Sequence, residues 1–236
     1  MMFIRSIVRK LGFDVVRHRF PVLTRKILSE VSPYTVVSQS GINAVIESTK
    51  YIVQNDIPGA FVECGVYKGG AMMTIALSLL SDGVTDRDLY LFDTFSGMPE
   101  PEERDRDLWG KSAIKKFQQT KMSGWVKCPL DEVKKAMSST GYPMERIHFI
   151  EGLVEDTLPE NAPESVALLR LDTDFYKSTL HELIHLFPLL SSKGVLIVDD
   201  YGHFEGSRDA VNEFFETNEL TPFLHRIDYA GRLVIK

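Results

Sequence analysis

The chain has 236 residues, 44% of them hydrophobic and 25% charged, which is the composition of a globular protein with one sizeable α/β domain. Its formal net charge of -6 argues against a general nucleic-acid binder. Cys64 and Cys128 are too few for a disulfide framework, no apolar run approaches the ~20 residues of a membrane span, and the N-terminus lacks a signal-peptide pattern. We therefore expect a cytoplasmic protein.

The N-terminal segment, residues 1–33, is basic and has apolar residues at roughly helical spacing. Seven Lys and Arg residues against Asp14 and Glu30 give it a local charge of +5, which leaves -11 for the rest of the chain. The pattern predicts an amphipathic helix. We favour a helix that docks on the domain or mediates dimerisation. A helix that rests on a membrane surface or grips an anionic substrate is the alternative.

The next elements form a helix, a strand, a glycine-rich turn and another helix. The helix of residues 40–55 stops before Pro58-Gly59, and Ala60–Cys64 is a short strand. The turn Gly65-Val-Tyr-Lys-Gly-Gly70 then leads into the helix 71–80. Backbone amides can approach a ligand closely at such a turn, although its spacing departs from the dinucleotide fingerprint.

A second strand, residues 89–92, ends in Asp93, where an acid can accept hydrogen bonds from a ribose diol. The long stretch 96–145 breaks the regular alternation and predicts a lid or a substrate-facing loop rather than core. Within it we expect a helix at 130–139. We interpret the charged run Glu100–Asp107 as a solvated face.

The last part of the chain completes a doubly wound sheet. We expect strands at 147–150, 166–171 and 195–198, helices at 178–190 and 207–217, and a closing antiparallel hairpin of 223–227 and 233–235. The buried stripe of helix 178–190 would be Leu180, Leu183, Ile184 and Phe187. The fold class is α/β, a single doubly wound domain.

Acidic residues follow the ends of these strands. Strand 166–171 runs into Asp172 and Asp174, and the apolar run 195–198 ends in Asp199-Asp200. Carboxylates gathered at one sheet edge repel one another and raise each other's pKa unless a cation or a proton lies among them. Oxygen ligands select a hard cation such as Mg²⁺. Helix capping is the competing explanation, above all for Asp174 and Asp200, and a bend after Asp199 is needed for both adjacent acids to reach one ion.

Five blocks of the chain, between about Tyr34 and Arg208, together resemble the macrocin O-methyltransferase family. They are Phe61-Val-Glu-Cys-Gly-Val-Tyr-Lys-Gly-Gly70, Phe92-Asp-Thr-Phe-Ser-Gly-Met-Pro99, Glu151-Gly-Leu-Val-Glu-Asp-Thr-Leu-Pro159, Leu169-Arg-Leu-Asp-Thr-Asp174 and Val198-Asp-Asp-Tyr-Gly202. The resemblance implies a seven-stranded, Rossmann-like class I methyltransferase domain over 34–236, and an enzyme that is often oligomeric. It also implies transfer of the methyl group of S-adenosylmethionine to a sugar hydroxyl.

The resemblance also implies roles for individual residues. Glu63 and Gly65 would hold the methionine end of S-adenosylmethionine, Asp93 the ribose hydroxyls, and Glu151–Asp156 would lie near the adenine. The full cofactor-binding set is Glu63, Gly65, Gly69, Asp93, Thr94, Glu151, Gly152 and Asp172. Asp172, Asp199 and Asp200 would bind Mg²⁺, and Asp174 would be the general base.

Other residues and other functions also fit parts of the sequence pattern. His203 is a competing base, and Tyr176, Lys177 and His181 are candidates for the pocket wall. We expect a small-molecule sugar or glycosylated substrate, no nucleic-acid partner and a homo-oligomer. A metal-dependent sugar-nucleotide or phosphoryl enzyme is an alternative, disfavoured by the absence of a Gly-Lys-Ser/Thr phosphate motif. A non-catalytic scaffold of the same fold is the other.

Overall fold

The computed structural model describes residues 20–120 and 126–236. The first part of the predicted N-terminal helix therefore lies outside the described residues, and so does Trp125. The apolar positions affected are Phe3, Ile4, Ile7, Val8, Leu11 and Phe13. The later part of that segment forms helix α2 (Val22–Val31), whose Ile27 and Val31 are buried in the core.

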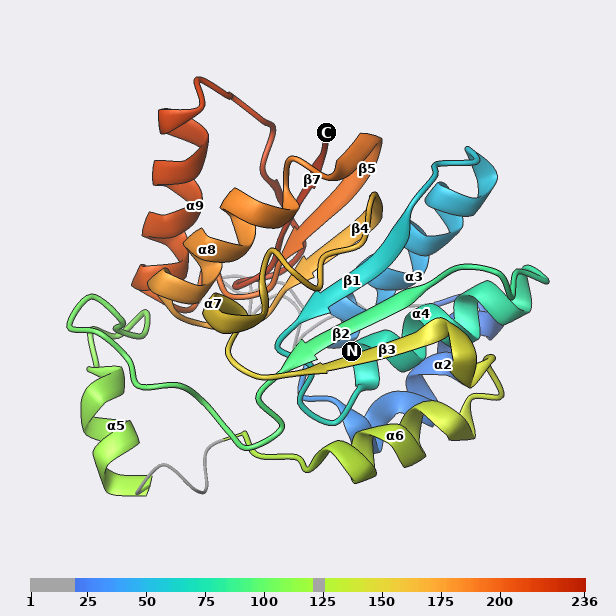
Figure 1. Ribbon diagram of the computed structural model, residues 1–236, viewed down its shortest axis with the longest axis horizontal. Helices are drawn as coiled ribbons and strands as arrows, with labels where there is room; N and C mark the ends of the chain where they lie inside the picture. The colour runs from blue at the N-terminus through green and yellow to red at the C-terminus, as the bar shows by residue number, and fades with distance from the viewer. Residues whose placement is uncertain (1–19, 121–125) are drawn as a thin grey trace, which may run out of the picture.

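A seven-stranded sheet organises the described residues, in the order β3-β2-β1-β4-β5-β7-β6. Neighbouring strands pair in parallel except where β7 runs antiparallel to β5 and β6. The predicted doubly wound α/β fold and closing hairpin are thereby confirmed (Figure 1). The strands are β1 (Ala60–Cys64), β2 (Leu89–Asp93), β3 (Ile147–Glu151), β4 (Val166–Leu171), β5 (Leu190–Val198), β6 (His225–Arg226) and β7 (Arg232–Ile235).

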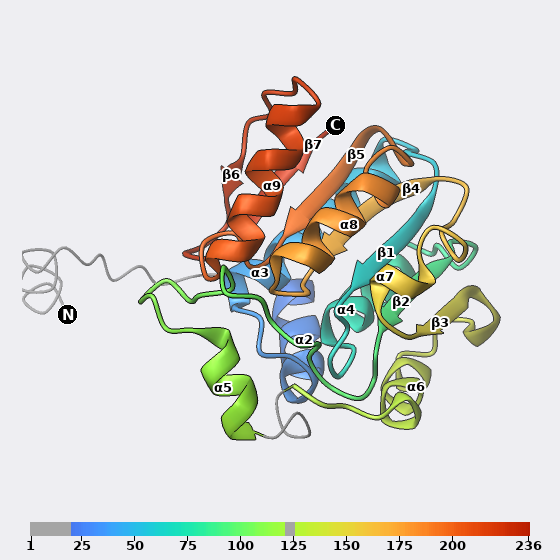
Figure 2. The same cartoon turned by 60° about the vertical axis from the view of Figure 1, so that its left-hand side comes forward.

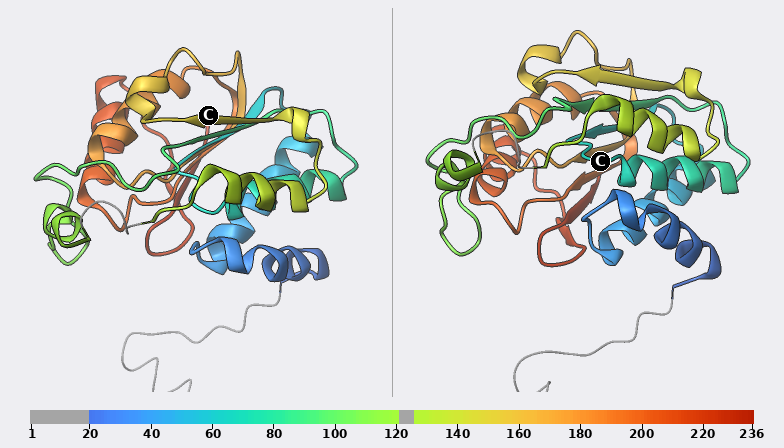
Figure 3. Two further views of the ribbon diagram at one scale, coloured as in Figure 1. Left: turned by 60° about the horizontal axis from the view of Figure 1, so that its bottom comes forward. Right: turned by 90° about the horizontal axis from the view of Figure 1, so that it is seen from below.

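Helices cover both faces of the sheet (Figure 3). One face packs against α2, α3 (Gln39–Gln54), α4 (Gly70–Ser81) and α6 (Leu130–Ser139). The other packs against α7 (Val154–Thr157), α8 (Tyr176–Leu186) and α9 (Glu205–Thr217). β1 and β4 are buried at every position, as expected for central strands between two helical layers. Among the described residues no helix is both long and apolar enough to cross a membrane.

The helix predicted for 178–190 is shorter than expected, and it begins and ends earlier in the chain. It begins at Tyr176 and ends at Leu186, and Leu190 is already the first residue of β5, where it pairs with Val166. Ile184 is 49% exposed, while Leu186 is fully buried, so the predicted stripe is wrong at that position. An apolar run alone does not distinguish a buried helix from a strand. The end of the predicted helix is therefore shorter because Leu190 pairs with β4 in the sheet.

The insertion after β2 divides into two parts with different environments. Its second part contains α6, whose Val133 and Met137 are fully buried, so this part belongs to the core against expectation. Its first part contains α5 (Ala113–Thr120) and lies beyond the carboxyl ends of the strands (Figures 1 and 2). Asp105, expected to be solvated, is 1% exposed because it accepts hydrogen bonds from two backbone amides.

Two short 3₁₀ helices complete the chain, η1 (Ser32–Tyr34) and η2 (Met144–Arg146). The strand order reverses between β1 and β4, because the chain winds outward to β2 and β3 on one side and to β5 on the other. Ligands of open α/β sheets bind beyond the carboxyl ends of the strands at such a point. We therefore expect a ligand site at the carboxyl ends of β1, β4 and β5.

Candidate active site

A cavity of about 300 Å³ lies at this switch point. Its wall includes residues from the ends of β1, β2, β4 and β5 and from the insertion. Most of the site residues predicted from the sequence line it: Glu63, Gly65, Asp93, Thr94, Gly152, Asp172, Asp174, Asp199, Asp200 and His203. The cavity is therefore the place where the sequence motifs converge.

Other predicted residues lie elsewhere. Gly69 is the residue before α4, and the Glu151 side chain is exposed at the end of β3; neither belongs to the cavity wall. Tyr176, Lys177 and His181 do not line the cavity either. Tyr176 instead donates a hydrogen bond to Glu213 and stacks under the guanidinium of Arg104, 3.9 Å from its ring centroid.

The glycine-rich turn after β1 is shaped by Asp93 and by close backbone contact. Gly65 has a φ of +83°, and a Cβ at this position would lie 2.0 Å from the carbonyl oxygen of Asp172. Asp93 Oδ2 accepts hydrogen bonds from the amides of Val66 and Tyr67 at 2.7 and 3.0 Å. Burial raises the pKa of Asp93 although these amides favour its charged form. The turn needs glycine for conformation and for space.

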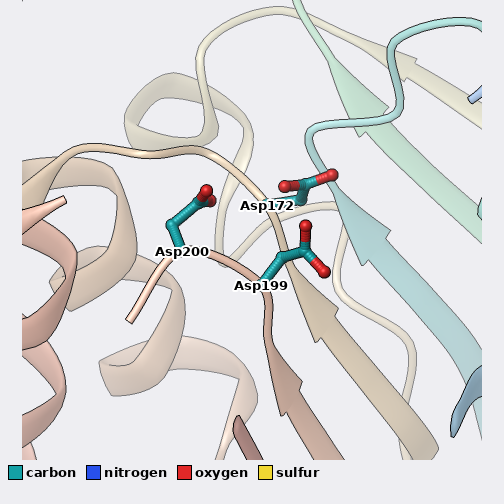
Figure 4. A group of neighbouring side chains, drawn as sticks. All are labelled: Asp172, Asp199 and Asp200. Atoms are coloured by element: carbon teal, nitrogen blue, oxygen red, sulfur yellow. The ribbon is translucent and has the colours of Figure 1, made fainter. Parts of the chain in front are cut away.

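Asp172, Asp199 and Asp200 come together at the ends of β4 and β5, and we call these three residues the acid cluster (Figure 4). One carboxylate oxygen from each lies within 4.8 Å of the others. The chain bends at Asp199-Asp200, directly after β5, which allows the two neighbouring side chains to share one site. Oxygen-only donors at this separation fit a hard divalent cation such as Mg²⁺.

Arg170 lies beneath these acids and was not anticipated from the sequence. Its side chain is 1% exposed and pairs with Glu63, with Asp172 Oδ2 at 2.7 Å and with Asp199 Oδ1 at 2.9 Å. Burial alone would lower the pKa of Arg170, but the three carboxylates outweigh it and hold the guanidinium charged. The Arg170 guanidinium therefore supplies part of the positive charge that we expected among the acids. A charged residue inside the apolar run 166–171 was the available signal.

Asp174 contacts Asp200, which is itself a member of the acid cluster. The Asp174 amide donates to Asp200 Oδ2 at 3.2 Å, and Asp174 has a φ of +64°. Burial and the charge of Asp172 raise the pKa of Asp174 to about 7; burial and Asp174 raise that of Asp200 well above its usual range. The N-cap positions of α8 and α9 are Phe175 and Phe204, so the capping explanation fails for both acids.

His203 lies in the cavity wall next to Asp200. Its backbone amide donates to the Asp200 carbonyl oxygen at 2.9 Å, and its Nδ1 lies 3.3 Å from the Tyr229 hydroxyl. Burial lowers the pKa of His203, which favours the neutral imidazole at pH 7. A neutral imidazole can accept a proton, so His203 keeps its place as a second candidate base.

Two buried carboxylate oxygens in the cavity wall are unpartnered within the described residues. They are Oε2 of Glu63, at the methionine-side position implied by the resemblance, and Oε2 of Glu155, on α7. Glu155 Oε1 accepts from Ser178 at 2.9 Å, which fixes the orientation of the group. A buried acceptor without a partner is costly, so both oxygens suit a ligand that brings N–H donors.

Solved structures define the class of protein. The O-methyltransferase NovP superposes with a TM-score of 0.77 at 28% identity, covering 86% of this chain and 82% of NovP. The calicheamicin methyltransferase CalS11 shares the fold, with a TM-score of 0.63 at 19% identity over 97% of this chain and 96% of that one. The sheet and its helices are thus the Rossmann-like fold of the class I O-methyltransferases.

The family follows from the sequence. The macrocin-O-methyltransferase (TylF) family model matches residues 26–235, and the chain belongs to this family of enzymes. Demethyldecarbamoylnovobiocin O-methyltransferase of Streptomyces niveus is 29% identical over 84% of this chain and 74% of its own length. Mycinamicin III 3''-O-methyltransferase of Micromonospora griseorubida is 28% identical over 84% and 76%. The resemblance predicted from the five sequence blocks is confirmed.

Proposed function

We propose that the protein transfers the methyl group of S-adenosylmethionine to a hydroxyl of a sugar or another vicinal diol, in a reaction that depends on Mg²⁺. The observation that carries the proposal is the position of the Asp172–Asp199–Asp200 cluster in the same cavity wall as the glycine-rich turn. The curated relatives are named for methylation of novobiocin and mycinamicin compounds, which supports natural-product or glycan biosynthesis as the setting.

The donor half of the cavity has groups that suit S-adenosylmethionine. Glu63 Oε2 can accept from an ammonium group, Asp93 can accept from ribose hydroxyls with its remaining lone pairs, and Glu155 Oε2 can accept from an exocyclic amine. When bound, S-adenosylmethionine supplies a methyl group on a positively charged sulfur. The residues of this half would bind and orient it.

The acceptor half has groups that suit a cation and a diol. Asp172, Asp199 and Asp200 would hold Mg²⁺ through carboxylate oxygens that Arg170 leaves available. When bound, Mg²⁺ supplies a positive charge that lowers the pKa of a nearby hydroxyl. Arg170 keeps the Asp172 and Asp199 carboxylates in place, so the acceptor oxygen meets a preorganised site.

Asp174 is the base that we propose for the acceptor proton. It lies two residues beyond Asp172, lines the cavity and has a pKa of about 7, which suits a general base at neutral pH. Its carboxylate would take the proton of the acceptor hydroxyl. His203 is the competing base.

Calorimetry with S-adenosylmethionine tests the donor half. We expect micromolar-range binding of S-adenosylmethionine to the wild type and binding at least tenfold weaker in Asp93→Asn. The asparagine side chain has only one oxygen that accepts hydrogen bonds, whereas the carboxylate has two. Asp88→Asn is the matched control, since Asp88 lies just before the same strand at its opposite end and pairs with Arg146 and His148. Thermal melting of both variants separates loss of binding from loss of folding.

The outcome also separates the alternatives. Tight nucleotide binding with no response to S-adenosylmethionine would favour a sugar-nucleotide or phosphoryl enzyme. No heat stabilisation by S-adenosylmethionine together with Mg²⁺ would favour a non-catalytic scaffold. Methyl transfer that follows the donor affinity of the variants would support the proposal.

A further inference from the structure

Two aromatic side chains, Trp109 and Tyr229, flank His203 beside the cavity, and we call this pair the aromatic rim. The ring centroids of Trp109 and Tyr229 lie 5.9 and 5.8 Å from that of His203, and both pairs are edge-to-face. His203 and Tyr229 line the cavity together with Asp199 and Asp200. The rim therefore borders the acidic end of the site.

Trp109 is held in place by its backbone. It lies in a tight turn in which Asp107 Oδ1 accepts hydrogen bonds from the amides of Trp109 and Lys111, both at 2.9 Å. The turn is tied to the start of α9 by a β-bridge between Asp107 and Phe204 and by the Glu205 amide, which donates to the Arg106 carbonyl at 2.8 Å. These contacts fix the turn beside His203, although the insertion is distant in sequence from α9.

The rim is exposed in a way that folding alone does not explain. Trp109 is 67% and Tyr229 55% exposed, and Val36 in the cavity wall is 83% exposed. Contact with water is unfavourable for large apolar surfaces, and contiguous exposed apolar groups mark binding sites. A rigidly positioned, exposed tryptophan next to a cavity is such a group.

We propose that the aromatic rim binds the aglycone of a glycoside acceptor whose sugar hydroxyls reach the acid cluster. This inference rests on the proposed function and narrows its substrate class to sugars attached to an aromatic or otherwise flat apolar group. An aromatic ring offers a large, rigid surface for stacking with such a group. His203 lies between the rim and Asp200, which matches the order aglycone, sugar, reacting hydroxyl.

Charge distinguishes this acceptor from a nucleotide sugar. The Asp107 carboxylate supports the Trp109 turn, and the acid cluster lies at the other side of His203. Lys111, 5.8 Å from the Trp109 centroid, and Lys116 in the cavity wall are basic groups at this end. A pyrophosphate would have to approach the acidic groups as well as these lysines, whereas a neutral aglycone meets no such opposition.

Binding of matched glycosides tests the proposal. The protein is saturated with Mg²⁺ and S-adenosylhomocysteine, which fills the donor side without turnover, and is titrated calorimetrically. The probes are phenyl and methyl glycosides of L-rhamnose, D-glucose and D-fucose, with TDP-rhamnose as a nucleotide sugar. We expect at least one phenyl glycoside to bind about tenfold more tightly than its methyl partner.

The rim variants assign this preference to a residue. Trp109→Ala should reduce the phenyl preference to less than about twofold, while Trp109→Tyr should retain part of it. Phe223→Ala is the matched control, because Phe223 is 83% exposed but lies outside the cavity wall, and it should leave the preference unchanged.

Three results would overturn the proposal: no phenyl preference in any pair, a preference that survives Trp109→Ala, or tighter binding of TDP-rhamnose than of every phenyl glycoside. The proposed function fails separately. Methyl transfer without a phenyl preference refutes the rim and leaves the reaction intact. A Trp109-dependent preference without methyl transfer from S-adenosylmethionine supports the rim and refutes the reaction.

Discussion

The acid cluster and the aromatic rim lie on opposite sides of His203 but are built in different ways. The carboxylates follow central strands and surround Arg170, whose side chain is 1% exposed. Trp109 and Tyr229 lie in loops and are more than half exposed. Substitutions in the acid cluster should therefore affect the stability of the fold, whereas substitutions in the aromatic rim should leave the core undisturbed.

This difference has a consequence for the enzyme. The groups that we propose to bind a cation and to move a proton directly follow strands of the sheet, so their geometry is rigid. The groups that we propose to contact the acceptor lie on an insertion fixed by a few backbone hydrogen bonds. One catalytic centre can therefore serve different acceptors when the rim is altered.

The largest effect is expected for the proposed base. Asp174→Asn should reduce the single-turnover rate of methyl transfer to a glycoside by about 10³-fold, or about 4 kcal/mol, and leave the affinity for S-adenosylmethionine unchanged. The physical reason is that an amide cannot take the acceptor proton. If His203→Gln produces the larger loss and Asp174→Asn little, His203 is the base instead.

The next effect concerns Arg170. Arg170→Met should lower the free energy of unfolding by about 3–5 kcal/mol in chelator, because it leaves buried carboxylates without their partner. Chemical denaturation measures the loss. Mg²⁺ should restore more stability to this variant than to the wild type, since the cluster becomes more negative.

Arg146→Met provides the control for that experiment. Arg146 forms an exposed ion pair with Asp88 at 3.5 Å, which we expect to contribute less than about 1 kcal/mol. An Arg170 variant as stable as the Arg146 variant would contradict the role of Arg170 as the internal cation of the site.

A smaller effect is expected in the dependence of stability on pH. Burial, partly offset by Arg170, raises the pKa of Glu63 to about 7, and burial with Asp172 raises that of Asp174 to about 7. Between the unfolded values near 4 and these folded values, the native state binds more protons. These groups therefore favour folding at low pH, and the stabilisation is lost as pH rises towards 7.

Melting curves with and without Mg²⁺ test the proposed ligands, because burial also raises the pKa of Asp172 and Asp200 and groups that do not contact the cation cancel in the difference. The stabilisation by Mg²⁺ should increase from pH 5 to pH 8, since the cation replaces protons on the carboxylates. A difference that is constant or falls over this range would show that the acid cluster is not the binding site.

The smallest effect is expected at the rim. Trp109→Ala should change the free energy of unfolding by less than about 0.5 kcal/mol, because the side chain is exposed and few core contacts are lost. Thermal and chemical denaturation measure it. A loss comparable to that of Arg170→Met would mean that Trp109 is a structural residue and would remove the contrast between the two regions.

The same contrast explains what the sequence could predict. β1, β4 and the acids after β4 and β5 were predicted because buried strands are continuous apolar runs and parallel strands end at a common edge. The ion pairs of Arg170 were missed because a pattern along the chain does not show which charges meet across a sheet. α5 and the Trp109 turn were not anticipated, since their positions depend on contacts with residues far along the chain, such as Phe204.

The central claim is that the acid cluster binds the cation on which methyl transfer depends. It is tested by following S-adenosylhomocysteine formation with a glycoside acceptor in excess chelator, after Mg²⁺ is restored, and in Asp199→Asn, with the exposed Asp209→Asn as control. We predict that activity is lost in chelator, returns with Mg²⁺, stays absent in Asp199→Asn and is normal in Asp209→Asn. Full activity in excess chelator, or in Asp199→Asn, would contradict the account.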